Sequence, residues 1–393
     1  MRRRLPFGVL VFVTLVACAS REVASTPQRE VGVVIERATG SVQVLDPARR
    51  ASVGRITDLG DLSHAAVVYS KGARFAYVFG RDGGLTKIDL ASKKVVARTV
   101  QAGNSIGGAI SRDGRLVAVA NYEPGGVKIF DAESLTLLSE IPSTYGTDGR
   151  RAKVVGIADA PDDRFVFSLF EAGEIWVVDA ADPRQPSVRK FRNVGKEPYD
   201  GLITTDGRWY IAGLFGEDGL ALLDMRNPDV GVKRILDGYG RGTEKLPVYK
   251  MPHLRGWATA GNYAFLPAIG RHEVLVVDTT SWKQVGAIPV HGQPVFVMAR
   301  PDGRQVWVNF AFPRNDTVQV IDVPTLGVVE TLKPGKTVLH MEFTTAGEEV
   351  WISARDDDRV VVYDTATFAR LAELPAQSPS GIFFTWRAGK VGL

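Results

Sequence analysis

Five histidines are the side chains of this 393-residue sequence best suited to metal ligation or proton transfer: His64, His253, His272, His291 and His340. Imidazole does both near neutral pH. The single cysteine, Cys18, excludes an intramolecular disulfide, a cysteine-built zinc site, an iron–sulfur cluster and a c-type haem, which needs Cys-x-x-Cys-His. No two histidines have the His-x-x-x-His spacing of a helical zinc site. The histidines therefore indicate a ligand-borne metal or acid–base chemistry, unless each is an ordinary polar residue.

Arginines and aromatic residues form a second group that could bind a ligand. An arginine can hold a carboxylate through two hydrogen bonds, and an aromatic ring can cover a planar macrocycle. Together they suit a tetrapyrrole that bears carboxylate side chains; the alternative is solvated arginines and aromatic rings packed between structural units. The members that fall in predicted loops are Arg81, Tyr122, Phe170, Phe215, Arg271, Phe310, Phe312 and Arg355.

An internal repeat predicts the elements that position these residues. Short apolar strands that end in aspartate recur every 42 to 54 residues, at Asp46, Asp89, Asp131, Asp179, Asp224, Asp278, Asp322 and Asp364. Each is preceded by another apolar strand, often after an Asp-Gly turn such as Asp113-Gly114, and is followed by a polar turn and a further strand. Four strands in about 42–45 residues is typical of a β-propeller blade.

Eight such units predict an all-β fold, an eight-bladed β-propeller that accounts for residues 31–393 as one domain. The segment 380–384 resembles an innermost strand with no blade after it, and 31–35 begins a blade at its second strand. We therefore expect the N- and C-terminal strands to pair and close the ring, which leaves no open sheet edge.

The propeller also predicts which candidates meet. Loops from an outer strand to the next inner strand share one face with the loops between second and third strands. His64, His340 and Asp200 stand at the start of inner strands, and His253, His272 and His291 fall in connections on the same side. We expect all of them on that face. The insertion 238–251 lies there too, as a lid or as an inert loop.

The N-terminus predicts export. Three arginines precede an apolar stretch that is too short to span a bilayer, which is the pattern of a signal peptide over residues 1–17. Leu15-Val16-Ala17-Cys18 resembles a bacterial lipobox, so we expect a periplasmic lipoprotein anchored to a membrane through Cys18, with 18–30 as a flexible tether. Removal of 1–17 lowers the formal net charge from +4 to +1, which gives no footprint for nucleic acid.

One stretch carries a specific resemblance. Ser63-His64, followed by Phe79-Gly80-Arg81-Asp82-Gly83-Gly84-Leu85-Thr86-Lys87-Ile88-Asp89, is similar to the haem d1-binding propeller of the cytochrome cd1 nitrite reductase family. The resemblance implies that His64 is the axial ligand of a haem iron and that Arg81 meets a haem carboxylate. It extends over nearly all of the chain after residue 30.

Departures from that family narrow the function. The chain lacks the c-haem segment of nitrite reductase and of the related dehydrogenase NirN, and Arg300-Pro301 stands where the reductase has a distal histidine before a proline. The pattern thus resembles the NirF group, which is needed to make haem d1. It implies binding of haem d1 or a late precursor and modification of a peripheral side chain. An oxidation would need an external electron acceptor. The alternatives are a carrier that delivers the cofactor to NirN or nitrite reductase, and an assembly scaffold.

Particular roles follow from this resemblance. We expect Tyr122, Arg271, Arg300 and Arg355 to contact the ligand beside His64 and Arg81, and His340, His253 and Asp200 to serve in acid–base or distal roles.

Overall fold

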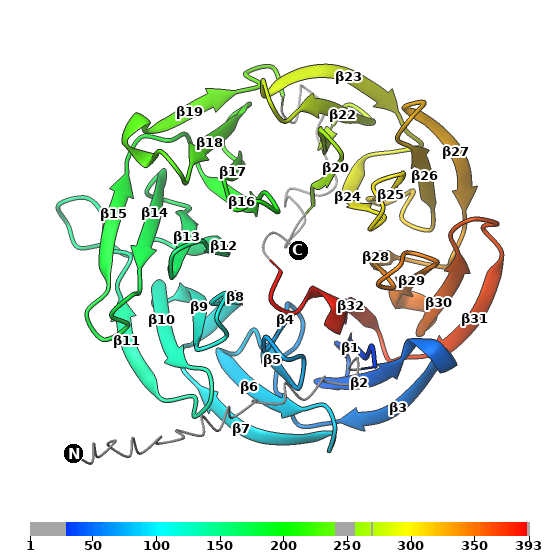
Figure 1. The fold of residues 1–393 in the computed structure, drawn as a ribbon, viewed down its shortest axis with the longest axis horizontal. Helices are drawn as coiled ribbons and strands as arrows, with labels where there is room; N and C mark the ends of the chain where they lie inside the picture. The colour runs from blue at the N-terminus through cyan, green and yellow to red at the C-terminus, as the bar shows by residue number, and fades with distance from the viewer. Residues whose placement is uncertain (1–28, 240–255, 269, 391–393) are drawn as a thin grey trace, which may run out of the picture.

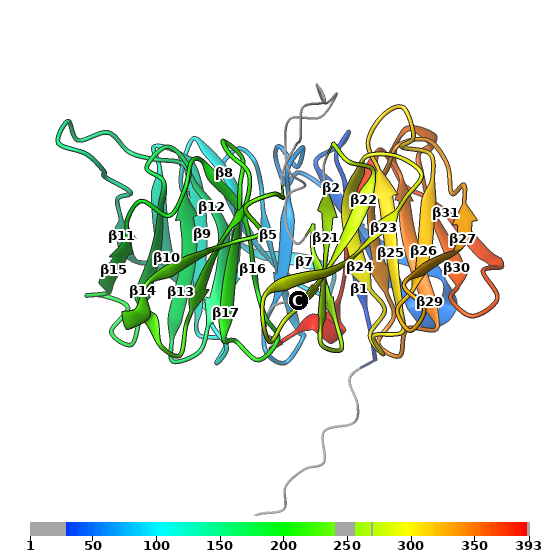
Figure 2. The same ribbon diagram turned by 90° about the horizontal axis from the view of Figure 1, so that it is seen from above.

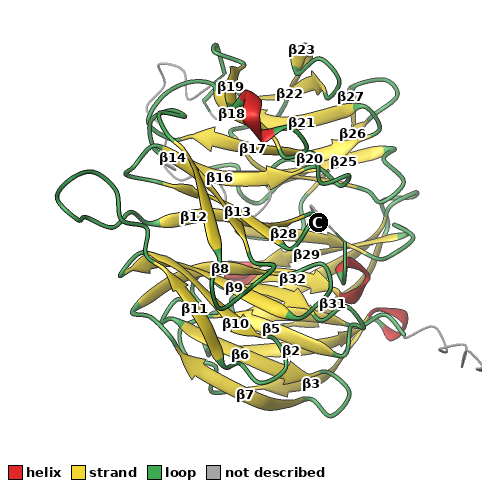
Figure 3. Ribbon diagram, turned by 60° about the vertical axis from the view of Figure 1, so that its left-hand side comes forward, coloured by secondary structure: helices red, strands yellow, loops and turns green. Residues whose placement is uncertain are grey.

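A computed structural model describes residues 29–239, 256–268 and 270–390. Over these residues the chain forms eight four-stranded antiparallel sheets arranged around one axis (Figure 1). Strands make up nearly all of the regular structure, and the helices are single 3₁₀ turns (Figure 3). The predicted eight-bladed β-propeller is confirmed. None of the helices in the described part of the chain is long and apolar enough to span a membrane.

The first four blades, each from its innermost to its outermost strand, have the following bounds. Blade 1 holds β32 (Pro379–Phe384), β1 (Gly32–Glu36), β2 (Ser41–Asp46) and β3 (Ala51–Ile56). Blade 2 holds β4 (Ala66–Tyr69), β5 (Phe75–Phe79), β6 (Gly84–Asp89) and β7 (Lys94–Val100). Blade 3 holds β8 (Asn104–Ile110), β9 (Leu116–Glu123), β10 (Gly126–Asp131) and β11 (Leu137–Ile141). Blade 4 holds β12 (Val154–Ala160), β13 (Arg164–Leu169), β14 (Glu174–Asp179) and β15 (Ser187–Phe191).

The remaining blades follow the same order. Blade 5 holds β16 (Pro198–Ile203), β17 (Trp209–Leu214), β18 (Leu220–Asp224) and β19 (Val232–Ile235). Blade 6 holds β20 (Ala258–Ala260), β21 (Tyr263–Ala268), β22 (Glu273–Asp278) and β23 (Lys283–Pro289). Blade 7 holds β24 (Pro294–Ala299), β25 (Gln305–Phe310), β26 (Val318–Asp322) and β27 (Gly327–Leu332). Blade 8 holds β28 (Val338–Phe343), β29 (Glu349–Ala354), β30 (Arg359–Asp364) and β31 (Arg370–Pro375). The 3₁₀ turns are η1 (Pro47–Arg49), η2 (Pro228–Val230), η3 (Arg355–Asp357) and η4 (Thr385–Arg387).

The two ends of the described chain close the ring as expected. β1 pairs with β2 on one side and with β32 on the other, so that Val33 lies between Val44 and Phe383. The backbone N–H of Thr385 donates to the carbonyl of Val31 at 2.8 Å. The hydrophobic core lies between neighbouring blades, where Trp176, Trp307 and other large side chains are fully buried. Closure lets the first and last blades bury their faces as the other blades do.

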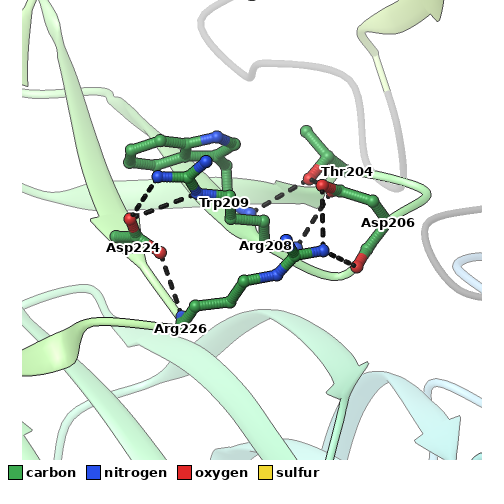
Figure 4. A network of polar contacts seen from close by, with 6 residues as sticks. All are labelled: Thr204, Asp206, Arg208, Trp209, Asp224 and Arg226. Atoms are coloured by element: carbon green, nitrogen blue, oxygen red, sulfur yellow. Dashed lines mark hydrogen bonds and ion pairs between the residues drawn. The ribbon is translucent and has the colours of Figure 1, made fainter. Parts of the chain in front are cut away.

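The repeated aspartate has a structural cause. It ends the third strand of every blade, where its carboxylate accepts backbone N–H groups of the turn that follows. In blade 5, Asp224 accepts the backbone N–H of Arg226 at 3.0 Å and the guanidinium of Arg208 at 3.0 and 3.2 Å (Figure 4). Thr204 and Asp206 brace the neighbouring turn through a 2.6 Å hydrogen bond. These aspartates are turn formers, because a carboxylate that accepts nearby N–H groups replaces the missing strand bonds.

The ring has two faces, seen as top and bottom in Figure 2. The upper face carries the connections from each outer strand to the next inner strand and the loops between second and third strands. The lower face carries the aspartate turns, the loops between first and second strands, and residues 385–390, which follow β32. The central axis joins the two faces along the innermost strands.

Candidate functional site

The structure brings His64 and Arg81 together on the upper face around Asp61. Asp61 accepts the backbone N–H of Ser63 on its carboxylate at 2.8 Å and the backbone N–H of Arg81 on its carbonyl at 2.7 Å. Burial alone would raise the pKa of Asp61, but the hydrogen bonds from Ser63 and the charges of Arg81 and His64 lower it. The turn before β4 and the loop between β5 and β6 are thereby tied together through one residue, Asp61.

Two more arginines extend this group, and sequence reasoning missed one of them. Arg37, in the loop between β1 and β2, is half-buried and has no carboxylate within ion-pair distance among the described residues. Burial, followed by the positive charge of Arg355, lowers the pKa of Arg37, while Asp61 and Asp356 oppose this shift. Arg355 itself pairs with Asp356 at 2.6 and 3.2 Å. We call Arg37, Arg81 and Arg355 the arginine arc; it spans blades 8, 1 and 2.

Aromatic side chains continue the band over blades 3 to 5. The hydroxyls of Tyr122 and Tyr199 are 2.8 Å apart, and the Tyr199 ring lies 5.7 Å from Phe170 and 5.8 Å from Phe215. We call these four residues the aromatic wall. Arg81 joins it to the arginine arc, since its guanidinium carbon lies 5.9 Å from the Tyr122 ring centre. Burial raises the pKa of both tyrosines, so both hydroxyls stay protonated at neutral pH.

Asp200 and His340 lie below the loops of the upper face, in bulges of the innermost strands. In β16, Pro198 pairs with Leu214 and Gly201 with Ala212, so Tyr199 and Asp200 both oppose Gly213. In β28, Leu339 and His340 likewise oppose Ser353. Register shifts also occur in β8, β12, β24 and β32. A bulge re-aims side chains, and here Asp200 and His340 both line the axial cavity.

The His340 ring is fixed by its neighbours. It lies 5.0 Å from the Phe296 ring and 5.4 Å from the Phe383 ring. Its Nδ1 accepts the backbone N–H of Ile382 at 3.2 Å. A neutral imidazole that accepts on Nδ1 carries its proton on Nε2. His340 is therefore arranged as a hydrogen-bond or proton donor rather than as a metal ligand.

The axial cavity has a volume of about 100 Å³ and is lined by the innermost strands β4, β8, β12 and β16, with further residues of β24, β28 and β32. It has room for only a few water molecules, each of which takes about 30 Å³ in the liquid. Sites for large organic ligands measure roughly 300–1,000 Å³. The axial cavity is therefore too small to hold a macrocycle.

The other predicted residues of the upper face have local partners. His291 Nε2 lies 3.0 Å from a guanidinium nitrogen of Arg314, and burial, followed by the charge of Arg314, lowers the pKa of His291. The Arg271 guanidinium donates to the carbonyl of Gly238, and His272 lies in the same loop, between β21 and β22. Phe310 is buried, whereas Phe312 is 67% exposed.

Some predicted residues fall elsewhere. Cys18, His253 and most of the 238–251 insertion lie outside the described residues. No group of three or more His, Cys, Asp or Glu side chains within the described ranges could hold a metal ion.

Arg300 is not part of the upper-face group, and its contact with a ligand stays a prediction. It lies on the lower face, between β24 and β25, because it follows an innermost strand instead of preceding one. Its Nε donates to the carbonyl of Gly347 at 2.9 Å, and its Nη1 lies 3.5 Å from Asp302. It lines a hollow of about 380 Å³ together with Trp257 and Trp386. The length of the innermost strands separates it from Arg81.

Known proteins match this arrangement over nearly the whole chain. The family model of the Cytochrome D1 heme domain matches residues 26–388. Protein NirF of Pseudomonas aeruginosa is 58% identical over 385 residues, which cover 98% of each chain. Protein NirF of Stutzerimonas stutzeri is 55% identical over 390 residues, which cover 99% of each chain.

A solved structure gives the same picture. The structure of the dihydro-heme d1 dehydrogenase NirN in complex with DHE superimposes with a TM-score of 0.79 at 27% identity, and covers 91% of this chain and 76% of that one. With the full-length identity to the two NirF proteins, this likeness leaves one assignment: the chain belongs to the NirF family, within the group of propellers built on the cytochrome D1 heme domain.

Proposed function

We propose that this protein acts in haem d1 biosynthesis by binding haem d1 or a late tetrapyrrole precursor on the upper face and modifying a peripheral side chain of the ring. The observation that carries the proposal is the continuous band of the arginine arc and the aromatic wall over blades 8 and 1 to 5. The dihydro-heme d1 dehydrogenase that shares the fold supports the choice of ligand.

The charge of the band suits a tetrapyrrole that carries carboxylates. Arg37 and Arg81 have no carboxylate within ion-pair distance among the described residues. Their guanidinium N–H groups are therefore available for ring carboxylates, which they can hold through paired hydrogen bonds. Phe170 and Phe215 lie in the aromatic wall, at the end of the band away from the arginine arc. Their apolar faces can pack there against the macrocycle.

We assign the iron ligand to His64. It stands on the upper face next to the arginine arc and outside the axial cavity, so a ring that lies over the face can bring its metal to the imidazole. Asp200 and His340 would face the same ring from below, where a carboxylate and an imidazole N–H can accept and donate protons.

Mass spectrometry of the pigment tests the action on a side chain. The purified protein is incubated with the late precursor and a panel of electron acceptors, and the extracted pigment is analysed. A defined change of mass that is lost in the Asp200→Asn and His340→Gln variants is the expected result. A pigment that binds one-to-one and leaves with its mass unchanged under every acceptor would make the protein a carrier instead.

The cellular setting is a separate proposal. We propose that the protein is a periplasmic lipoprotein held at a membrane through Cys18, and that it passes its product to NirN or to nitrite reductase. Fractionation of producing cells should find the wild-type chain with membranes and the Cys18→Ser chain in the soluble fraction. An equal distribution of the two chains between membrane and soluble fractions would contradict the proposed lipid anchor at Cys18.

A further inference from the structure

The axial cavity continues away from the proposed ligand site to the lower face. Asp200 and His340 line it at the level of the bulges. Lys71, Arg112 and Lys390 line the same cavity where it meets the lower face. One passage thus joins the candidate acid–base groups to a second opening, on the side of the propeller that the macrocycle does not cover.

Three cations that have no carboxylate partner in the described part of the chain surround that opening. Lys71, Arg112 and Lys390 have no acidic side chain within ion-pair distance among the described residues. Other arginines of the lower face do have one: Arg74 lies 3.0 Å from Asp89, and Arg208 lies 3.0 Å from Asp224. The three cations come from different segments: the Lys71 side chain lies against Gly389, Arg112 reaches toward Gly207 of blade 5, and Lys390 covers the Trp386 ring at 4.5 Å.

The wall of the opening is a fixed structure. Arg387 makes two hydrogen bonds to the fully buried Glu342, at 2.6 and 2.9 Å, and Trp386 Nε1 donates to the carbonyl of Phe343 at 2.8 Å. Glu342 neutralises Arg387, and the carboxylates of the described residues that line the passage are Asp159 and, at the level of the bulges, Asp200. Among the described residues, the charge around the opening is therefore net positive.

We propose that the axial passage is a second entrance to the site, selective for small anions, through which water and carboxylate-sized or bicarbonate-sized oxyanions move between the lower face and Asp200 and His340. The size of the passage excludes the macrocycle, and its charge favours anions over neutral or cationic molecules. The purpose of the passage rests on the proposed function, because a ring bound over the upper face would close the other route from solvent.

Cysteine alkylation measures the selectivity. In the full chain with Cys18→Ser, Ala158→Cys places a thiol on the wall of the passage, and Val96→Cys, on the exposed outer strand β7, serves as the matched control. The probes are iodoacetate, an anion, and iodoacetamide, a neutral molecule of similar size. We expect the ratio of the iodoacetate rate to the iodoacetamide rate to be roughly tenfold higher at residue 158 than at residue 96.

A charge variant decides the cause. Combined Lys71→Gln, Arg112→Gln and Lys390→Gln should bring the ratio at residue 158 down to the value at residue 96, while Lys71→Arg with Lys390→Arg should keep it high. A thiol at 158 that resists both reagents would overturn the proposal, as would equal ratios at both positions in the parent chain.

Alkylation with haem d1 bound separates this proposal from the function on which it rests. Ala38→Cys, on the exposed loop beside Arg37, reports the upper face. We expect haem d1 to slow alkylation at residue 38 and to leave the rate at residue 158 unchanged. Loss of reactivity at 158 would contradict the second entrance, whereas an unprotected thiol at 38 in a haem-loaded protein would contradict the proposed ligand site.

Discussion

The two faces of the propeller use charge in different ways. On the lower face each third strand ends in an aspartate that accepts turn N–H groups and that, in blades 1, 2 and 5, also pairs with an arginine (Figure 4 shows blade 5). On the upper face Arg37 and Arg81 lie beside one carboxylate, Asp61, and form an ion pair with none of the described acidic residues. The repeated residues thus satisfy one another and hold the fold, while the unrepeated ones keep hydrogen-bonding capacity for a ligand.

The largest expected effect is on the free energy of unfolding, through the buried ion pair between Glu342 and Arg387. Glu342→Gln leaves Arg387 without its buried partner, and removing one member of a buried ion pair costs about 3–5 kcal/mol. Denaturant unfolding should show this loss. Glu373→Gln, which breaks an exposed pair with Arg370, should cost at most about 1 kcal/mol. Equal stability of the two variants would refute the role given to the Glu342–Arg387 pair.

The next effect belongs to the upper face. Combined Arg37→Gln and Arg81→Gln should weaken haem d1 binding by at least about 100-fold, since each arginine loses a hydrogen bond to a charged group, and each such bond contributes roughly 1.5–3 kcal/mol. Absorbance titration measures the change. Arg74→Gln, on the lower face, is the control and should bind as the wild type does. A double variant with wild-type affinity would show that the arginine arc is not the carboxylate site.

A smaller effect on stability should follow Asp224→Ala. The change removes the bond to the Arg226 N–H and the contact with Arg208, at a cost of about 1–2 kcal/mol, and haem d1 affinity should not change. Chemical denaturation and the same titration test both parts. An unaltered free energy of unfolding, or a loss of haem d1 affinity, would contradict the claim that the lower-face aspartates stabilise the fold while the upper face binds the ligand.

The smallest expected effect is the pH dependence of the stability that Asp224 contributes on the lower face. Burial would raise the pKa of Asp224, but its hydrogen bonds to Arg208 and Arg226 lower it overall. The unfolded state therefore binds the proton more readily, so this contribution is complete above about pH 4 and is lost as the pH falls through the lower folded pKa. The difference in unfolding free energy between wild type and Asp224→Ala should shrink below pH 4. A constant difference down to pH 2 would be inconsistent with this account.

The sequence predicted the ring and the face on which part of the candidate site lies. Eight aspartate-ended strands predicted eight blades because each turn needs a carboxylate at the same place, and the unpaired segments at 31–35 and 380–384 predicted the closure. His64 and Arg81 were found because they stand at loop positions that the repeat defines. Arg37 occupies an equivalent loop of blade 1 and could have been found in the same way.

Other features had no local signal. The bulges that turn Asp200 and His340 toward the axis depend on the register between strands, which composition does not reveal. The Tyr122–Tyr199 contact joins residues 77 positions apart. Arg300 lies apart from the upper-face group because a residue that follows an innermost strand lies on the opposite face from one that precedes it.

An absorbance titration of wild-type and His64→Ala protein with haem d1 tests the central claim most directly. Wild type should bind one equivalent with the spectrum of a histidine-ligated iron. His64→Ala should bind more weakly and show a changed spectrum, whereas His272→Ala, in the upper-face loop between β21 and β22 of blade 6, should match wild type. An unaltered affinity and spectrum in His64→Ala would contradict the assignment of the upper face as the haem d1 site with His64 as the iron ligand.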